Sequence, residues 1–124
     1  MKAIHYDAEG DILSVTFAVT DTGKQTGIEL SDNIVLYYNP ETKEPLQLIL
    51  LSYQAMVQAT TQQPILLEGL ANAPIKIQKT IAKILTSTPI SAFLQLIEGD
   101  DSKLPTSRLR EIFTPAALQT VLAV

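Results

Sequence analysis

Apolar residues within the first 51 positions of the chain occur in short runs that turn-forming residues separate. The most regular run is Ile34–Tyr38, whose residues are all β-branched, aliphatic or aromatic and suit a packed β-strand. Ser-Asp-Asn at 31–33 and Asn-Pro-Glu at 39–41 bound this run, as turn residues do. Because successive side chains of a strand point to opposite faces, both faces of this strand carry apolar groups. We therefore predict that Asn33–Asn39 is the central strand of a small antiparallel sheet that is covered on both faces.

Similar patterns predict further strands on both sides of this one. They occupy residues 3–6, 11–17, 25–30 and 46–51, and short connections join them. The first connection, at 7–10, ends in Gly10, which we expect to adopt a positive φ in a hairpin turn. About five strands with short connections predict a β-meander.

Apolar residues after position 51 recur at helical spacing instead. Ser52 is placed to cap a short helix, and Pro64–Leu70 predicts one further helical turn. The clearest helix runs from Pro74 to Thr86, with apolar residues on one side and lysines on the other. Its apolar stripe comprises Ile77, Ile81, Ile84 and Leu85, and its lysines are Lys76, Lys79 and Lys83.

The last third of the chain allows two interpretations. Thr88-Pro89 resembles a cap followed by a first helical turn, and helical spacing over 90–97 favours a helix ended by Gly99. The short apolar run Phe93–Ile97 could instead be a sixth strand, and of the two interpretations we favour the helix. A loop at 100–105 and short helices at 107–113 and 116–123 complete the prediction. The predicted fold class is α+β in a single domain, with an antiparallel β-meander over 1–51 and a helical half over 52–124 that packs on the sheet.

Composition narrows the range of partners. The chain has 124 residues, of which 46% are hydrophobic, so it is long and apolar enough to form a globular core. Its net charge of −4 argues against a nucleic acid held through phosphate contacts. Residues 1–51 contain eight acids and three bases, whereas residues 52–124 contain five acids and six bases. An acidic sheet half suits contact with a basic protein surface.

The sequence also restricts the location of the protein. It has no cysteine, and therefore no disulfide or thiolate metal site. His5, Asp7 and Glu9 follow Lys2 at once, with no apolar signal-peptide region, and no apolar run is long enough to span a membrane. We expect a cytoplasmic protein with no cofactor and with neither a membrane nor a nucleic acid as its partner.

A resemblance to a known family rests on residues 6–15, which read Tyr-Asp-Ala-Glu-Gly-Asp-Ile-Leu-Ser-Val. This stretch is similar to the opening motif of domain of unknown function family 2283, a family of small bacterial proteins, which reads Tyr-Asp-x-Glu-x-Asp-x-Leu-x-aliphatic. Glu29 and the strands at 34–38 and 46–51 also fit the layout of the family, so the resemblance covers residues 3–52. It implies a compact β-meander with no established activity or catalytic residues, and some members are suspected antitoxins that act beside small basic toxins.

Two departures from the family pattern point to a covered surface. Tyr37 and Ile49 stand where such sequences often place acidic residues, so a sheet face that is commonly polar is apolar here. An apolar face of this kind is normally covered, here by the C-terminal half or by a second copy of the chain. We therefore predict a homodimer, with Tyr37, Ile49 and Tyr53 as its candidate interface residues.

Two groups of residues are candidates for chemistry. Asp7, Glu9 and Asp11 have the spacing of the first ligands of a calcium loop, but the later bidentate glutamate of such a loop is missing, and a solvated turn is the simpler interpretation. His5 is the one histidine, and nothing in the sequence places it in a triad with Ser14 or another nucleophile. The function we predict is a non-catalytic, self-associating protein-interaction module. The alternatives are an antitoxin-like acidic partner of a small basic toxin and a metal-dependent enzyme that acts on a small ligand.

Overall fold

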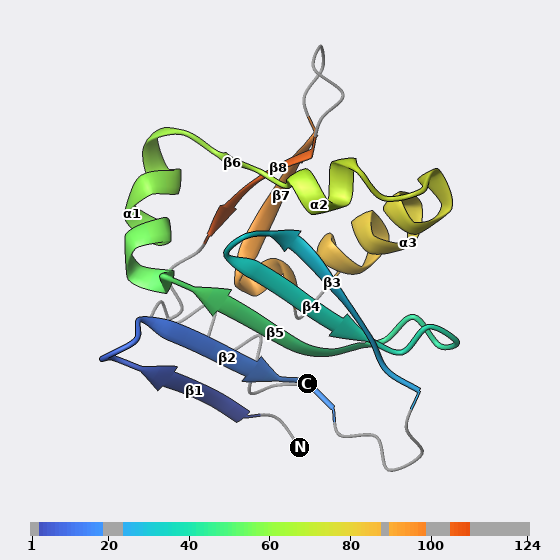
Figure 1. Ribbon diagram of the computed structural model, residues 1–124, viewed down its shortest axis with the longest axis horizontal. Coiled ribbons are helices and arrows are strands. Elements are labelled where there is room, and N and C mark those ends of the chain that lie inside the picture. The colour runs from blue at the N-terminus through green and yellow to red at the C-terminus, as the bar shows by residue number, and fades with distance from the viewer. Residues whose placement is uncertain (1–2, 19–23, 88–89, 99–104, 110–124) are drawn as a thin grey trace.

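The first half of the chain forms a five-stranded antiparallel sheet. Its strands are β1 (Ala3–Asp7), β2 (Ile12–Thr16), β3 (Thr26–Ser31), β4 (Ile34–Tyr38) and β5 (Pro45–Leu51). The computed structural model, which describes residues 3–18, 24–87, 90–98 and 105–109, arranges them in the order β1-β2-β5-β4-β3 (Figure 1). Turn residues between the strands and apolar alternation along them explain why these segments pair.

The strand order differs from the predicted one in its centre. The middle position belongs to β5, whereas β4 lies between β5 and β3, so the prediction that residues 33–39 form the central strand is wrong. Three connections join neighbouring strands as in a meander, but the link from β2 to β3 passes from the second to the fifth position of the sheet. Both β4 and β5 are apolar on their two faces, so the pattern alone cannot decide which one occupies the centre.

The second half of the chain packs on this sheet, which confirms the predicted α+β class. It contains helices α1 (Tyr53–Gln62), α2 (Glu68–Ala71) and α3 (Ile75–Leu85), the 3-10 turn η1 (Ile90–Ala92), and strands β6 (Ile65–Leu66), β7 (Leu94–Glu98) and β8 (Pro105–Leu109). The last three strands form a small antiparallel sheet in the order β6-β8-β7. In the part of the chain that the structure describes, no helix is long and apolar enough to cross a membrane.

Several predicted helices are strands. Residues 94–98 pair with 105–109, so the preferred helix over 90–97 is wrong and the alternative of a strand is confirmed. The helix predicted to begin at residue 107 is wrong for the same reason, and the turn of helix predicted over Pro64–Leu70 is divided between β6 and α2. In these segments, pairing with strands that are distant in the sequence determines the secondary structure, although the apolar residues are spaced as in a helix. The predicted cap at Thr88-Pro89, the loop at 100–104 and the helix at 116–123 lie outside the described residues.

The longest predicted helix is confirmed. It begins after Pro74 and ends before Thr86, and Ile81, Ile84 and Leu85 of its apolar stripe are buried. Its three lysines are exposed. Proline before the first turn and an unbroken apolar stripe therefore locate a helix well in this chain.

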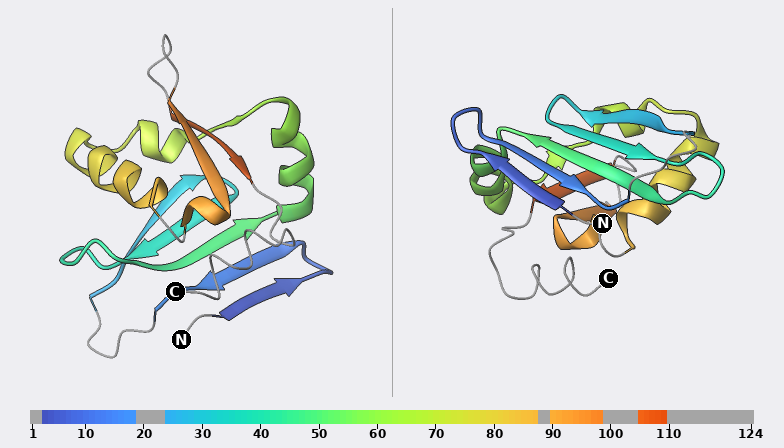
Figure 2. Two further views of the ribbon diagram at one scale, coloured as in Figure 1. Left: turned by 180° about the vertical axis from the view of Figure 1, so that it is seen from behind. Right: turned by 90° about the horizontal axis from the view of Figure 1, so that it is seen from below.

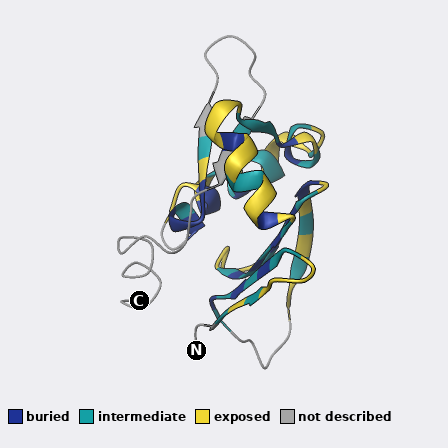
Figure 3. Ribbon diagram, turned by 90° about the vertical axis from the view of Figure 1, so that its left-hand side faces the viewer, coloured by how far each residue is buried: buried dark blue, intermediate teal, exposed yellow. Residues whose placement is uncertain are grey.

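The described elements of the second half lie on one side of the sheet (Figure 2). One cluster of buried apolar side chains joins the sheet to these elements. Buried and half-buried positions alternate along β2, β4 and β5, so one face of each strand supplies the core (Figure 3). The rings of Phe17 and Phe93 meet edge to face across the two layers, with their centroids 5.9 Å apart. The largest fully buried side chains are those of Tyr53, Phe93, Leu13, Leu30, Ile34, Leu36, Leu48, Leu50, Leu67, Ile81, Leu85 and Ile90.

A close backbone contact holds α2 against β3. A Cβ atom built on Gly69 would lie 1.7 Å from the carbonyl oxygen of Glu29, a distance that no side chain can occupy. Glycine at this position therefore lets the short helix approach the backbone of the last strand in the sheet.

Candidate functional site

The face of the sheet opposite the core is turned toward the viewer in Figure 1, and no described helix or strand lies in front of it. The described elements of the second half lie behind the sheet in this view. We call this surface the outer face. It is formed by Ile12, Ser14 and Thr16 of β2, Val35 and Tyr37 of β4, and Gln47, Ile49 and Leu51 of β5, all of them half-buried.

The outer face is apolar across three adjacent strands. Ile49 pairs with Val35 on one side and Leu51 pairs with Ile12 on the other, so their side chains are direct neighbours. With Tyr37 these residues form a continuous apolar strip. The structure thus places the predicted interface residues Tyr37 and Ile49 on one surface, over adjacent strands.

The ring of Tyr37 extends the strip onto β3. Gly27 is the partner of Tyr37 in the strand register, and a Cβ atom on Gly27 would lie 2.7 Å from Cε1 of that ring. The tyrosine therefore lies across the bare glycine backbone, a packing that protects weak glycine positions in sheets. The ring of Tyr37 thus covers Gly27 on the outer face.

Polar side chains lie at the two ends of the strip. The register aligns His5, Ser14, Ile49, Val35 and Glu29 in one row across all five strands. His5 and Glu29, at opposite ends of this row, are both exposed. An apolar centre with a polar rim is the usual composition of a protein interface.

Tyr53 does not belong to this surface. Its side chain is 1% exposed, and its ring packs edge to face on Tyr6 with 6.2 Å between the centroids. The residue opens α1 on the core side of the sheet, so it is a core residue of its own chain and the prediction that it contacts a partner is corrected.

The acidic cluster Asp7, Glu9 and Asp11 is divided by its contacts. Asp11 caps α1: its Oδ1 accepts hydrogen bonds from the backbone N–H of Gln54 at 2.8 Å and from the Tyr6 hydroxyl at 2.7 Å. Its Oδ2 accepts a hydrogen bond from the N–H of Ala55 at 3.3 Å. Asp7 instead accepts a hydrogen bond from the N–H of Glu9 within the turn.

This arrangement corrects two expectations about the first hairpin and α1. Asp11, with φ of 54°, takes the left-handed conformation that we expected of Gly10. Ser52 makes no side-chain cap, because the carboxylate of Asp11 already occupies the N-terminus of the helix. Asp11 is thus a structural residue that joins β2 to α1.

The same hydrogen bonds shift the pKa values of Asp11 and Tyr6. Hydrogen bonds from the N–H of Gln54 and then from Tyr6 stabilise the charged carboxylate, which holds the pKa of Asp11 below its ordinary value of 3.8. The Asp11 carboxylate in turn raises the pKa of Tyr6 above 10.0, because the hydroxyl proton is held by its acceptor.

Asp11→Asn is expected to lower the melting temperature at pH 7 by roughly 2–5 °C, the order expected for a weakened helix cap in a domain of this size. Asparagine tolerates the left-handed backbone, so the variant mainly removes the charge. Because the folded pKa is depressed, the stabilisation is present above pH 3.8 and is lost as pH falls through the folded pKa. The variant should therefore lose less stability than the native protein between pH 5 and pH 2, measured by thermal denaturation.

Asp7→Asn is the matched control, since it removes the same charge from a carboxylate that contacts only its own turn. Equal effects of the two substitutions would show that Asp11 does not hold α1.

Catalytic and metal-binding arrangements receive no support from the described residues. No group of three or more His, Asp or Glu side chains among them is placed to hold a metal ion. His5 lies opposite Ser14 in the register, with Asp7 on the same strand face, but no hydrogen bond joins His5 to either side chain within the described part. The register places these residues near one another without the contacts that a triad needs.

Comparisons with known proteins add no assignment. No protein-family model matches the chain, and no significant match is found among curated proteins or among solved structures. The resemblance of residues 3–52 to domain of unknown function family 2283 therefore stays a prediction.

Proposed function

We propose that the protein is a non-catalytic interaction module that self-associates through the outer face of its sheet. The observation that supports this most strongly is the apolar strip of Ile12, Val35, Tyr37, Ile49 and Leu51, over which no described element packs. Removal of such a strip from water is the main driving force for association of two sheet faces. Two such faces pack at about 10 Å with their strands roughly aligned.

The charges at the ends of the strip favour a second copy in one orientation. A two-fold axis parallel to the strands places β1 of one copy over β3 of the other, so that His5 meets Glu29 of the second copy. Histidine donates a hydrogen bond to a carboxylate in either of its charge states. An axis perpendicular to the strands would instead place Glu29 over its own counterpart, and this like-charge contact is unfavourable. Ile49, in the middle of the row, meets its own counterpart in both arrangements.

Light scattering of the intact protein over a range of concentrations tests this proposal. The native chain is expected to reach the mass of a dimer, and Tyr37→Asp is expected to shift the protein to the monomer by placing a charge within the strip. Gln58→Asp adds the same charge on the exposed side of α1 and is expected to leave the dimer intact. A native monomer at all concentrations, or equal effects of both variants, would contradict the proposal.

A second candidate function is that of an acidic partner for a small basic protein, as in antitoxins. The resemblance to family 2283 supports it, as do the exposed carboxylates Asp7, Glu9 and Glu29 at the rim of the sheet. Within the described residues, the only ion pair joins Lys24 to Glu41, so these three carboxylates are available to a cationic surface. A neighbouring gene that encodes a short basic protein would support this function, and an isolated gene would count against it.

A further inference from the structure

A pocket of about 530 Å³ lies between α3 and the turn that joins β4 to β5. One wall is formed by Thr80, Lys83 and Ile84 on one face of α3 and by Ser87, which lies two residues beyond the end of the helix. The opposite wall is formed by Thr42 and Lys43 of the turn. The buried residue Ile84 is the aliphatic member of the lining. Its volume falls within the range that holds small ligands.

The charge of the lining is of one sign. Two lysines line the pocket and no carboxylate does. Neither Lys43 nor Lys83 takes part in an ion pair within the described residues, where Glu41 already pairs with Lys24. Both lysine side chains are exposed, so their positive charges attract an anion to the lining.

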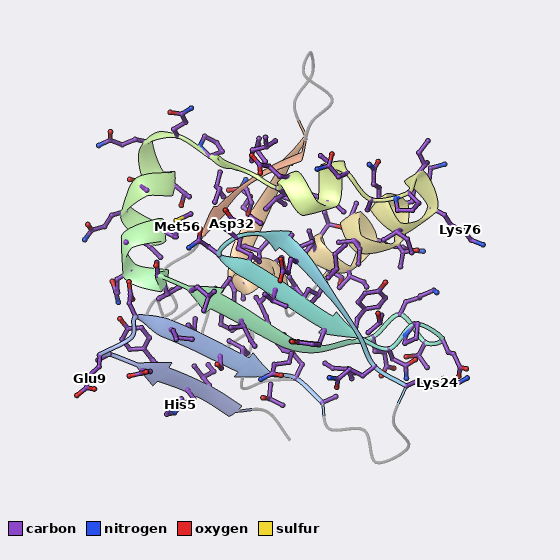
Figure 4. All side chains as sticks on the ribbon, viewed as in Figure 1. His5, Glu9, Lys24, Asp32, Met56 and Lys76 are labelled. Carbon is purple, nitrogen blue, oxygen red and sulfur yellow. The ribbon has the colours of Figure 1, made fainter. Side chains whose placement is uncertain are left out.

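The surroundings of the pocket extend this positive region. Lys76 and Lys79 continue along α3, and both are exposed. In Figure 4, Lys24 and Lys76 lie on the same side of the molecule, whereas Glu9 lies at the opposite side. The turn also contains Glu41, which pairs with Lys24, and Glu44, but the three lysines of α3 and Lys43 outnumber these carboxylates and favour the approach of small anions.

Two residues that line the pocket have hydrogen-bond donors that are available to an anion. The Thr42 hydroxyl accepts a hydrogen bond from the N–H of Glu44 at 3.3 Å, so its own proton is free to be donated. Lys43 donates one hydrogen to the carbonyl of Pro40 and keeps two, since an ammonium group has three.

Two C-terminal carbonyls of α3, which would repel an anion, accept side-chain hydrogen bonds. The Thr86 hydroxyl donates to the carbonyl of Ala82 at 3.0 Å, and the Ser87 hydroxyl donates to that of Ile84 at 2.7 Å. These bonds partly offset the negative end of the helix dipole beside the pocket.

We propose that this pocket binds a small oxyanion, phosphate or carboxylate, between the ammonium groups of Lys43 and Lys83. The Thr42 hydroxyl supplies a third donor, and Ile84 contacts an apolar part of the ligand when there is one. The proposal does not depend on self-association, because the pocket is built from α3 and the 39–44 turn and not from the outer face.

Titration with inorganic phosphate, followed by amide chemical shifts at constant ionic strength, tests this site. We expect saturable shifts at residues of the 42–43 turn and of α3, and an affinity about tenfold lower in Lys83→Gln, the usual loss of one charge-assisted hydrogen bond. Lys79→Gln removes the same charge from α3 outside the lining and is expected to leave the affinity within about twofold.

Acetate in a parallel titration distinguishes the two ligand chemistries, since tighter binding of phosphate or of acetate identifies the group that the pocket prefers. Equal losses in Lys83→Gln and Lys79→Gln would overturn the proposal, because they would reflect the general field of the lysines. Shifts that do not saturate, or that sodium chloride reproduces, would also overturn it. Lys43→Gln gives a second test from the turn, where no helix can be disrupted.

Discussion

Replacement of Gly69 with alanine is expected to destabilise the protein by about 3 kcal/mol or more, at the upper end of the usual cost of overpacking. The added methyl group would lie 1.7 Å from the carbonyl oxygen of Glu29 and 2.8 Å from its carbonyl carbon. Both are backbone atoms of β3, which cannot rotate away as a side chain would. The helix α2 must therefore move off the sheet, and Leu67 and Leu70 leave the core with it. Urea denaturation followed by circular dichroism measures the loss.

Gly10→Ala provides the comparison for this prediction. A Cβ atom at Gly10 would lie 2.9 Å from Oδ2 of Asp7, the end of an exposed side chain that can turn aside. We expect this substitution to cost less than about 1 kcal/mol, as surface changes usually do. A similarly small cost for Gly69→Ala would show that α2 does not rest on the backbone of β3.

Leu36→Ala is expected to cost about 2–5 kcal/mol, because it removes one methine and two methyl carbons from a site with no solvent exposure. Leu36 lies on the core face of β4 and is paired with Leu48 of the central strand. A cavity there is bordered by strands on both sides, which limits how far the surroundings can collapse. The midpoint of urea denaturation should fall while its slope stays unchanged.

Leu51→Ala makes the same chemical change on the outer face of β5, where the side chain is half-buried. In the monomer we expect a cost of about 1 kcal/mol, since less apolar area leaves water there on folding. Self-association would raise this cost at high protein concentration and leave that of Leu36→Ala nearly unchanged. If Leu51→Ala and Leu36→Ala cost the same free energy of unfolding at every protein concentration, both the assignment of the two faces and the proposed dimer would be contradicted.

Local sequence patterns predict where most helices and strands lie, but they do not predict which strands pair with one another. The first five strands and α3 follow from alternation, turn residues and a proline at a helix start, and the structure confirms them. The sequence offers β7 only as the less favoured alternative to a helix, and it does not predict β8, because the two strands are defined by the pairing of Leu94–Glu98 with Pro105–Leu109. The central position of β5 is also a property of pairing, because β4 has the same apolar pattern.

The candidate surfaces show the same division. Strand alternation places Tyr37 and Ile49 on one face, so this part of the outer face could be predicted from the sequence. The role of Asp11 could not, since the amide that it caps lies 43 residues further along the chain. Tyr53 was misplaced because a tyrosine next to a sheet fits an interface and a core equally well. Lys43 and Lys83 line the same pocket although they are far apart in the sequence, and no sequence pattern predicts that they lie near each other.

The position of β5 also constrains the order in which the chain can assemble during its synthesis. The hairpins β1–β2 and β3–β4 are complete in the nascent chain before residue 45 emerges, yet they do not contact each other in the finished sheet. Until β5 inserts between them, both β2 and β4 present an unpaired edge that can bind the strand of another nascent chain. Pro45–Leu51 is therefore the segment that completes the sheet, and a pause of the ribosome before it would prolong the exposure of these two strand edges.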